Sequence, residues 1–267
     1  MSKFGFIGAG NMGGAIITAL SNAISAENIS ISDIDSKKVD EFCNSLGVIA
    51  STNEEIAKTS DYIILAVKPQ FMKSVLEDIS DILKSRINQV VLVSIAAGLS
   101  TEKLRDFAKG EFKIIRVMPN TPALLGEGMM LYTITENISN DETNEFIGAM
   151  TECGKWDLID EKLIDAASAL SGCGPAFVYM FIEALADGAV KCGLSREKAL
   201  QYASQTLKGA ALMVEQTGKH PELLKDEVCS PGGSTIAGVS ALEKGKFRAT
   251  CIQAVEKAYK RTLELGK

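Results

Sequence analysis

A glycine-rich turn near the start of the chain has residue types and a spacing that suit phosphate binding. It reads G-A-G-N-M-G over positions 8–13, follows a short apolar run and opens a segment whose apolar residues recur at helical spacing. In such a strand-turn-helix unit, Gly8 makes the tight turn, Gly10 lets a pyrophosphate approach the backbone, and Gly13 lets the helix pack on the sheet. The pattern predicts a dinucleotide-binding turn made of Gly8, Ala9, Gly10, Asn11, Met12 and Gly13.

An acidic residue follows the second predicted strand at a position that suits the sugar of a nucleotide. Residues 29–32 are predicted as this strand, and Asp33 comes directly after it, 20 residues beyond Gly13. A carboxylate at this place accepts hydrogen bonds from an adenosine ribose. We therefore expect Asp33 to bind the ribose.

A second polar turn lies far along the chain and reads S-P-G-G-S-T-I-A-G over positions 230–238. Its proline fixes one φ angle, its two adjacent glycines allow unusual backbone conformations, and an apolar-periodic run follows. We expect Ser234 or Thr235 to be the N-cap of a helix there. The free N–H groups at such a helix start could bind a carboxylate or a phosphate, and an ordinary capped loop is the alternative.

Strands that alternate with helices occupy the first part of the chain and place the glycine-rich turn. This alternation predicts a Rossmann-type doubly wound parallel sheet, in which ligands bind beyond the carboxyl ends of the strands. Those ends are predicted at 8–13, Asp33, 66–69 and 118–122. The predicted strands are 3–7, 29–32, 48–50, 62–67, 90–95 and 112–118, and 129–133 and 155–158 could close the sheet.

The strand pattern disappears after about position 160, and long apolar helices follow. We predict a dinucleotide-binding Rossmann domain over 1–160 and an all-helical domain over 161–267. The helices predicted over 175–192 and 195–217 are apolar around much of their circumference. We therefore expect a homodimer through this domain, and packing against the first domain alone is the alternative.

Composition excludes several classes of function. The 267 residues carry a net charge of -6, without a cluster of Lys or Arg, which argues against nucleic acid and anionic membranes as partners. We expect no signal peptide and no membrane span, and therefore a cytoplasmic protein. Six cysteines without a C-x-x-C pair and a single histidine predict neither disulfides nor a metal site. That histidine, His220, is expected in a solvated loop.

Seven motifs in order give the chain a resemblance to pyrroline-5-carboxylate reductase over essentially its whole length. In the first half they read FIGAGNMG at 6–13, AVKP at 66–69, RVMPNTP at 116–122 and GEG at 126–128. In the second half they read SGCGPAF at 171–177, EALADG at 183–188 and SPGGSTI at 230–236.

The resemblance implies reduction of 1-pyrroline-5-carboxylate to L-proline with hydride from NADH or NADPH, the last step of proline synthesis. It implies that the turn at 230–235 holds the substrate carboxylate and that the Thr235 hydroxyl is the catalytic group, hydrogen-bonded to the ring nitrogen. It also implies homodimers with interleaved helices, which can gather into a decamer of five dimers. The implied substrate-binding residues are Ser230, Gly232, Gly233, Ser234 and Thr235. To the cofactor-binding residues above, the resemblance adds Asn53, Ala66, Val67, Lys68, Pro69 and Asn120.

The chain departs from the family pattern in three places. Cys173 and Cys229 stand where Ser and Thr are usual, and neither is expected to be catalytic. Glu227 replaces a more typical amide just before the second turn, so its charge could alter substrate affinity. After the second strand the chain reads Asp33-Ile34-Asp35, where many relatives carry Asn-Arg-Ser or Asn-Arg-Thr. Two carboxylates repel a 2′-phosphate, so we predict a preference for NADH over NADPH.

Two other functions fit parts of the pattern. A β-hydroxyacid dehydrogenase of similar architecture would need a lysine on the long helix after the glycine-rich start at 171–175. The helix predicted over 175–192 has no lysine before Lys191, which argues against alcohol oxidation. A non-catalytic NAD(P)-binding sensor would be expected to lose the turn at 230–235, which is intact here.

Overall fold

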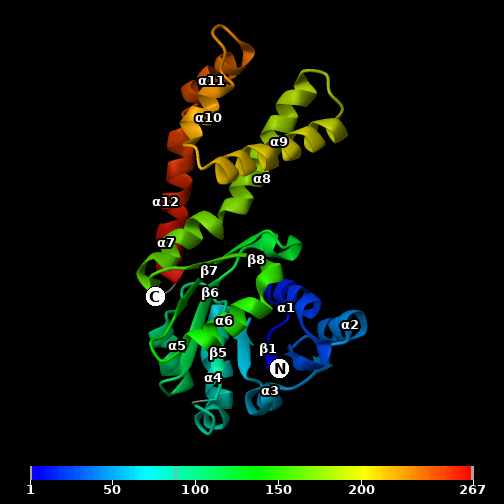
Figure 1. Cartoon of the computed structure of the whole chain (residues 1–267), viewed down its shortest axis with the longest axis vertical. Helices are drawn as coiled ribbons and strands as arrows, with labels where there is room; N and C mark the ends of the chain where they lie inside the picture. Colours follow the sequence, from blue (N-terminus) through cyan, green and yellow to red (C-terminus); the bar gives the residue numbers. More distant parts are fainter. Residues whose placement is uncertain (1, 88, 266–267) are drawn as a thin grey trace. The chain divides into compact units, whose positions relative to one another are not determined.

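The computed structural model describes residues 2–87 and 89–265, so residues 1, 266 and 267 at the ends of the two predicted domains lie outside it. The chain forms two compact units (Figure 1). The nucleotide unit comprises Met1–Cys173 with Ala258–Lys267, and the helical unit comprises Gly174–Lys257. This division differs from the boundary predicted after residue 160, because the first helix beyond that position packs on the sheet of the nucleotide unit.

The described residues of the nucleotide unit contain one eight-stranded sheet of order β3-β2-β1-β4-β5-β6-β7-β8. All neighbouring strands pair in parallel except β6 and β7, which are antiparallel. The predicted doubly wound parallel sheet is thus confirmed for its first six strands, whereas β7 turns back beside β6. The strands are β1 (Phe4–Ile7), β2 (Ile29–Ser32), β3 (Ile49–Ala50), β4 (Tyr62–Leu65), β5 (Val91–Ser94), β6 (Lys113–Met118), β7 (Gly128–Ile134) and β8 (Gly154–Leu158).

Helices and short 3-10 turns connect these strands. Pro69 is the first residue of α4, where its fixed φ and missing N–H suit a helix start. The helices of this unit are α1 (Asn11–Ala23), α2 (Ser36–Leu46), α3 (Asn53–Thr59), α4 (Pro69–Lys84), α5 (Thr101–Ala108), α6 (Asn140–Ala149) and α7 (Glu161–Ser171). The 3-10 turns are η1 (Ala26–Asn28), η2 (Thr121–Leu125) and η3 (Thr151–Cys153).

The core of the nucleotide unit lies on both faces of the sheet. Strand β4 shows why, since its side chains alternate between the two faces and are all buried. Tyr62 and Ile64 belong to a cluster with α1 and α6, whereas Ile63 and Leu65 belong to a cluster with α3, α4 and α5. The two clusters fix the strand ends on which the predicted site depends.

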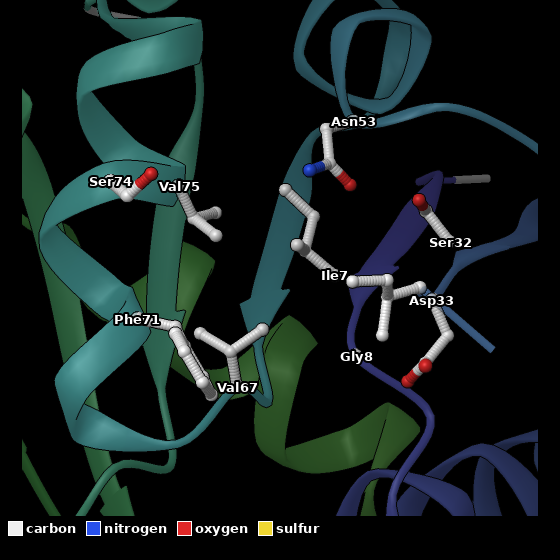
Figure 2. Close-up of a pocket in the computed structure, with 10 residues that line it drawn as sticks. Ile7, Gly8, Ser32, Asp33, Asn53, Val67, Phe71, Ser74 and Val75 are labelled. Carbon is white, nitrogen blue, oxygen red and sulfur yellow. The ribbon is translucent and has the colours of Figure 1, made fainter.

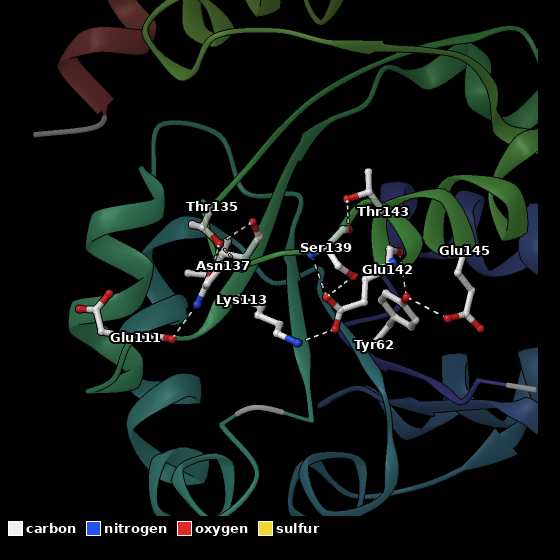
Figure 3. A network of polar contacts seen from close by, with 10 residues as sticks. Tyr62, Glu111, Lys113, Thr135, Asn137, Ser139, Glu142, Thr143 and Glu145 are labelled. Carbon is white, nitrogen blue, oxygen red and sulfur yellow. Dashed lines mark hydrogen bonds and ion pairs between the residues drawn. The ribbon is translucent and has the colours of Figure 1, made fainter.

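A polar network attaches the start of α6 to the sheet (Figure 3). The Tyr62 hydroxyl donates to the Glu142 carbonyl at 2.8 Å, and Lys113 Nζ lies 2.6 Å from Glu142 Oε1. Ser139 and Glu142 form a capping box that begins α6. Burial and the neighbouring Glu145 carboxylate raise the pKa of Tyr62, so the phenol stays protonated.

The helical unit has only a small apolar core. Its buried cluster consists of Ala186, Ala199 and Ala203, where α8 crosses α9. The helices are α8 (Gly174–Lys191), α9 (Arg196–Thr217), α10 (Pro221–Glu227), α11 (Ser234–Lys244) and α12 (Phe247–Leu265), whose last residues belong to the nucleotide unit.

One stretch, Glu161–Lys191, is long and apolar enough to cross a membrane by length and composition, although the sequence analysis expected no span. It consists of α7 and α8, with a break at Gly172 and Cys173. The acidic side chains of α7 contact a buried arginine of the sheet, which attaches this part of the stretch to the nucleotide unit.

Candidate functional site

The glycine-rich turn has the geometry that the sequence predicts. Gly8 has a φ of +105°, and a Cβ there would lie 2.6 Å from the Ala66 carbonyl oxygen. A Cβ on Gly13 would lie 2.7 Å from the Gly8 carbonyl oxygen, so both glycines are required by close packing. At Gly10 a Cβ would meet nothing within 4 Å, and this is the side that an approaching group could occupy.

The start of α1 offers donors for an anion. Gly10 is the N-cap and supplies no side chain to the first turn, which contains Asn11, Met12 and Gly13. The first N–H groups of a helix have no acceptor within the helix, and the helix dipole favours negative charge there. A pyrophosphate therefore fits this turn.

Asp33 lies beside the glycine-rich turn, as predicted, and its carboxylate is fixed. One oxygen accepts a hydrogen bond from the Ala9 N–H at 2.5 Å, and the other accepts from the Asp35 N–H at 2.9 Å. Asp35 in turn accepts from the Lys37 N–H as the N-cap of α2. Ile34 between them is fully exposed. The two carboxylates are thus held by the backbone next to the glycine-rich turn.

A cavity of about 500 Å³ opens at the carboxyl ends of β1, β2 and β4 (Figure 2). Asp33 and Asn53, the first residue of α3, supply polar groups, and Val67, Phe71 and Val75 supply apolar walls. Such a mixture of apolar walls and a few polar groups is typical of small-molecule sites. The cavity adjoins Gly8, so a nucleotide whose pyrophosphate lies on α1 can extend into it.

The turn after β4 places the predicted residues 66–69 next to the glycine-rich turn. The Ala66 N–H donates to the Ile7 carbonyl at 2.8 Å, which continues the pairing of β4 with β1. Lys68 is the N-cap of α4 and is exposed. Its side chain is therefore available to a ligand, although a solvated turn residue would look the same.

Asn120 lies at the carboxyl end of β6 and is 8 % exposed. Its Nδ2 donates to the Ser171 carbonyl at 3.0 Å, and its Oδ1 accepts from the Met129 N–H at 2.9 Å. The sequence analysis assigned Asn120 to the cofactor alone and missed these protein contacts. No local signal marks them, because the partners lie 9 and 51 residues away.

Sequence reasoning also missed the buried ion pairs of Arg116. Its guanidinium is 3 % exposed and lies 3.3 Å from Glu161 and 2.5 Å from Asp165, both on α7. A signal was present, since a charged residue in the middle of an apolar strand requires a partner. Arg116 is such a residue in β6.

The turn at 230–235 forms a helix start without a side-chain cap. Gly232 has a φ of +65°, and the Gly233 N–H donates to the Ser230 carbonyl at 3.0 Å. Gly233 is the N-cap of α11, so the prediction that Ser234 or Thr235 caps this helix was wrong. The chain closes tightly here, because a Cβ on Gly233 would overlap the Ser230 hydroxyl. Ser234 and Thr235 instead lie in the first turn of α11, exposed.

Ion pairs involve the helix α10, which precedes this turn. Glu227, expected to bring a negative charge to the turn, lies 2.6 Å from Lys219 Nζ, which offsets that charge. On α10, hydrogen bonds from Lys225 and Arg248 lower the pKa of Glu222 to about 2 and connect α10 with α12. His220 is the N-cap of α10, a structural role.

The described residues contain no group of three or more His, Cys, Asp or Glu side chains that could hold a metal ion. The donors and walls described above suit a dinucleotide on the nucleotide unit and a small anion at the start of α11.

Family models match both parts of the chain. Residues 161–265 match the model described as pyrroline-5-carboxylate reductase dimerisation, and residues 3–98 match the model described as NADP oxidoreductase, coenzyme F420-dependent. The apolar stretch Glu161–Lys191 lies within the residues that match the dimerisation model.

Relatives match the chain from end to end. The pyrroline-5-carboxylate reductase of Arabidopsis thaliana is 44% identical, over 99% of this chain and 96% of its own. That of Escherichia coli is 40% identical, over 99% of this chain and 98% of its own. The crystal structure of Plasmodium falciparum pyrroline carboxylate reductase with NADP bound is 39% identical, with a TM-score of 0.90 and coverage of 100% and 98%. This chain, with its Rossmann-type nucleotide unit and helical dimerisation unit, therefore belongs to the pyrroline-5-carboxylate reductase family of NAD(P)-dependent oxidoreductases.

Proposed function

We propose that this enzyme reduces the C=N bond of 1-pyrroline-5-carboxylate to L-proline, as the last step of proline biosynthesis, with NADH preferred over NADPH. The observation that carries the proposal is the start of α11. There Gly233 is an N-cap without a side-chain hydrogen bond, and Ser234 and Thr235 of the first turn are exposed. This arrangement suits a small carboxylate with a polar atom next to it.

The reaction needs orientation more than a strong acid. When bound, the reduced nicotinamide supplies a hydride to the imine carbon, while the ring nitrogen takes up a proton and NAD⁺ is the oxidised product. A cyclic imine is basic enough to take that proton from water. The chain therefore has to hold the substrate carboxylate and polarise the C=N bond.

In our proposal, the turn at 230–235 binds the substrate. Backbone N–H groups of this turn donate to the carboxylate, and the Thr235 hydroxyl hydrogen-bonds the ring nitrogen and helps to protonate it. In the described chain, the hydroxyls of Ser234 and Thr235 make no hydrogen bond within the protein, so Thr235 is free to take this role. The substrate residues are Ser230, Gly232, Gly233, Ser234 and Thr235.

The nucleotide unit binds the cofactor in this proposal. The start of α1 takes the pyrophosphate, Asp33 and Asn53 take the adenosine side, and the residues after β4 and β6 lie near the nicotinamide half. Ala9 contributes its N–H to Asp33 rather than to phosphate. The cofactor residues are Gly8, Ala9, Gly10, Asn11, Met12, Gly13, Asp33, Asn53, Ala66, Val67, Lys68, Pro69 and Asn120.

The NADH preference rests on the fixed carboxylates of Asp33 and Asp35. Because the Ala9 N–H holds the Asp33 carboxylate beside the ribose position, a 2′-phosphate would meet negative charge, and the adjacent Ile34 offers no compensating donor. Lys37 and Lys38 in the first turn of α2 are exposed and could lessen the repulsion. The 39% identical Plasmodium protein binds NADP, so the preference is a property we assign to this chain's own residues.

The helical unit is proposed to form a homodimer, which can assemble into a decamer of five dimers. Its exposed apolar residues and its match to the dimerisation model support the dimer. We also propose a cytoplasmic location, which the six free cysteines support.

The test is an assay of the purified protein with 1-pyrroline-5-carboxylate and NADH. Loss of the nicotinamide absorbance together with formation of L-proline is the expected result. Tight NADH binding without turnover would instead favour a non-catalytic sensor and would refute the proposal.

A further inference from the structure

Helix α7 is attached at its first turn to strand β6. Arg116 on β6 is 3 % exposed and lies between Glu161 and Asp165 of α7, at 3.3 Å and 2.5 Å. Glu161 also accepts hydrogen bonds from the Thr101 N–H and hydroxyl, both at 2.7 Å. Glu161 thus joins the start of α7 to β6 through Arg116 and to the start of α5 through Thr101.

The other end of α7 is attached to the same strand. Asn120, just beyond β6, donates to the carbonyl of Ser171, the last residue of α7. The ten residues from 161 to 171 span about 15 Å of helix, and the four from 116 to 120 span about 13 Å of extended chain. These lengths agree, so the two attachments are compatible in spacing, and between them α7 packs against the neighbouring strand β7. We call the two attachments the α7 anchors.

The anchor at Arg116 is the stronger of the two. A buried guanidinium between two carboxylates makes charge-assisted hydrogen bonds, whereas Asn120 makes neutral ones. Removing the arginine would leave Glu161 and Asp165 without their shared partner, and α7 would lose its fixed position. The Asn120 amide would then lose its acceptor on Ser171.

We propose that Arg116 is a positioning residue for the reduction: it fixes α7 on the sheet, and so helps to hold the Asn120 amide in one orientation beyond the end of β6. The proposal rests on the proposed function, which places Asn120 near the nicotinamide half. An amide nitrogen has two hydrogens. With one donated to Ser171 and the Oδ1 held by the Met129 N–H, the bond to α7 completes the set of contacts that determines where the second hydrogen points. Arg116 acts through α7 and Asn120 and touches neither substrate nor cofactor.

The test compares Arg116→Met with Lys113→Met in the full-length protein. Both residues lie on β6 and pair with a carboxylate, but Lys113 is at the strand's other end, where it contacts Glu142. We expect Arg116→Met to lower kcat for 1-pyrroline-5-carboxylate on the order of 10- to 100-fold and to raise the KM for the imine. The Kd for NADH, measured by fluorescence on the folded protein, should change less than about twofold, because α1 and Asp33 carry that binding. Lys113→Met should leave all three values near those of the parent.

Two further variants keep the proposal testable if Arg116→Met does not fold. Asp165→Asn removes one charge while preserving shape, and should reproduce the kinetic change in part. Arg116→Lys keeps the charge and should recover part of the lost kcat. Parent-like kcat and KM in both Arg116→Met and Asp165→Asn, or equal losses in Lys113→Met, would overturn the proposal. A parent protein that does not reduce the imine would refute the proposed function instead.

Discussion

The two units differ in how they bury apolar side chains. The nucleotide unit has a large cluster on each face of its sheet, with fully buried residues such as Leu20 and Ile64. The helical unit, all of whose residues are described, has a buried cluster of three alanines and exposes large side chains such as Met180. The first unit is stabilised by its own sequence, whereas the second carries the surface expected of half an interface.

This difference also corresponds to the two proposed binding sites, one for the cofactor and one for the substrate. A cofactor needs a fixed anion site and a shaped cavity, and a sheet with two buried faces supplies rigid strand ends for both. The turn that we propose for the substrate instead lies between α10 and α11 in the unit with the small core. Near it, within one chain, lies the half-exposed ion pair Lys219–Glu227, and in our account a second copy of the chain completes its surroundings.

The largest expected effect comes from a charge in the exposed apolar surface of the helical unit. Met180 on α8 is 70 % exposed, so Met180→Glu would be harmless on a free surface. Under a partner, the buried carboxylate would cost several kcal/mol, and the dimer and its activity should be lost. Light scattering and an activity assay measure both.

The matched control for Met180→Glu is Ile49→Glu on the edge strand β3 of the nucleotide unit, where the side chain is also exposed. It should remain a dimer with parent-like activity, within about 0.5 kcal/mol in stability. An active dimer of Met180→Glu would contradict the interface at that part of α8.

A core deletion in the nucleotide unit should have a smaller effect of a different kind. Leu20→Ala removes a fully buried side chain and should lower the free energy of unfolding by about 2–5 kcal/mol. Because this core lies within one chain, the loss should not depend on protein concentration, whereas the melting of the helical unit should. Thermal unfolding measured at several protein concentrations distinguishes the two units. The same concentration dependence of melting for both units would contradict the difference between them.

Thr235→Ala should change the turnover of the imine without changing the nucleotide unit. Loss of the hydroxyl should lower kcat/KM for the imine about 100-fold, with NADH binding unchanged. Thr206→Ala, which removes an exposed hydroxyl from α9, is the control and should behave like the parent. A parent-like kcat/KM in Thr235→Ala would show that the role assigned to Thr235 is wrong.

The smallest effect concerns acid stability of the nucleotide unit. Burial alone would raise the pKa of Glu142, but hydrogen bonds from Lys113 and Ser139 outweigh it and lower that pKa below its ordinary value of 4.5. The folded form therefore gains stability above the unfolded pKa and loses it as the pH falls through the folded pKa. The contribution should be about 1 kcal/mol or less, since the pair is partly solvated. Denaturant unfolding between neutral pH and pH 3 should show this loss in the parent and not in Glu142→Gln.

Much of the nucleotide unit could be predicted because its signals are local. Gly8, Gly13 and Pro69 mark a strand end or a helix start within a few residues, and the alternation of strands and helices gives the sheet. The reversed direction of β7 has no such signal, because pairing with β6 is decided by contacts across the sheet.

The missed features of the site depend on long-range partners. The attachments of Arg116 and Asn120 to α7 join residues 45 to 51 positions apart, which no periodicity reveals. The prediction of the N-cap of α11 was wrong for a local reason. Gly233 already adopts the extended backbone of an N-cap, so Ser234 and Thr235 lie within the helix. The attachment of α7 to the sheet also explains why the compact units divide after Cys173.

The most direct test of the account measures kcat/KM for 1-pyrroline-5-carboxylate with NADH and with NADPH on one preparation of the protein. It requires the substrate turn, the nucleotide unit and the Asp33 carboxylate to act as proposed. We predict L-proline as the product with either cofactor and a higher kcat/KM with NADH. No L-proline despite bound NADH would contradict the proposed reaction, and a kcat/KM well in favour of NADPH would contradict the role of Asp33 and Asp35.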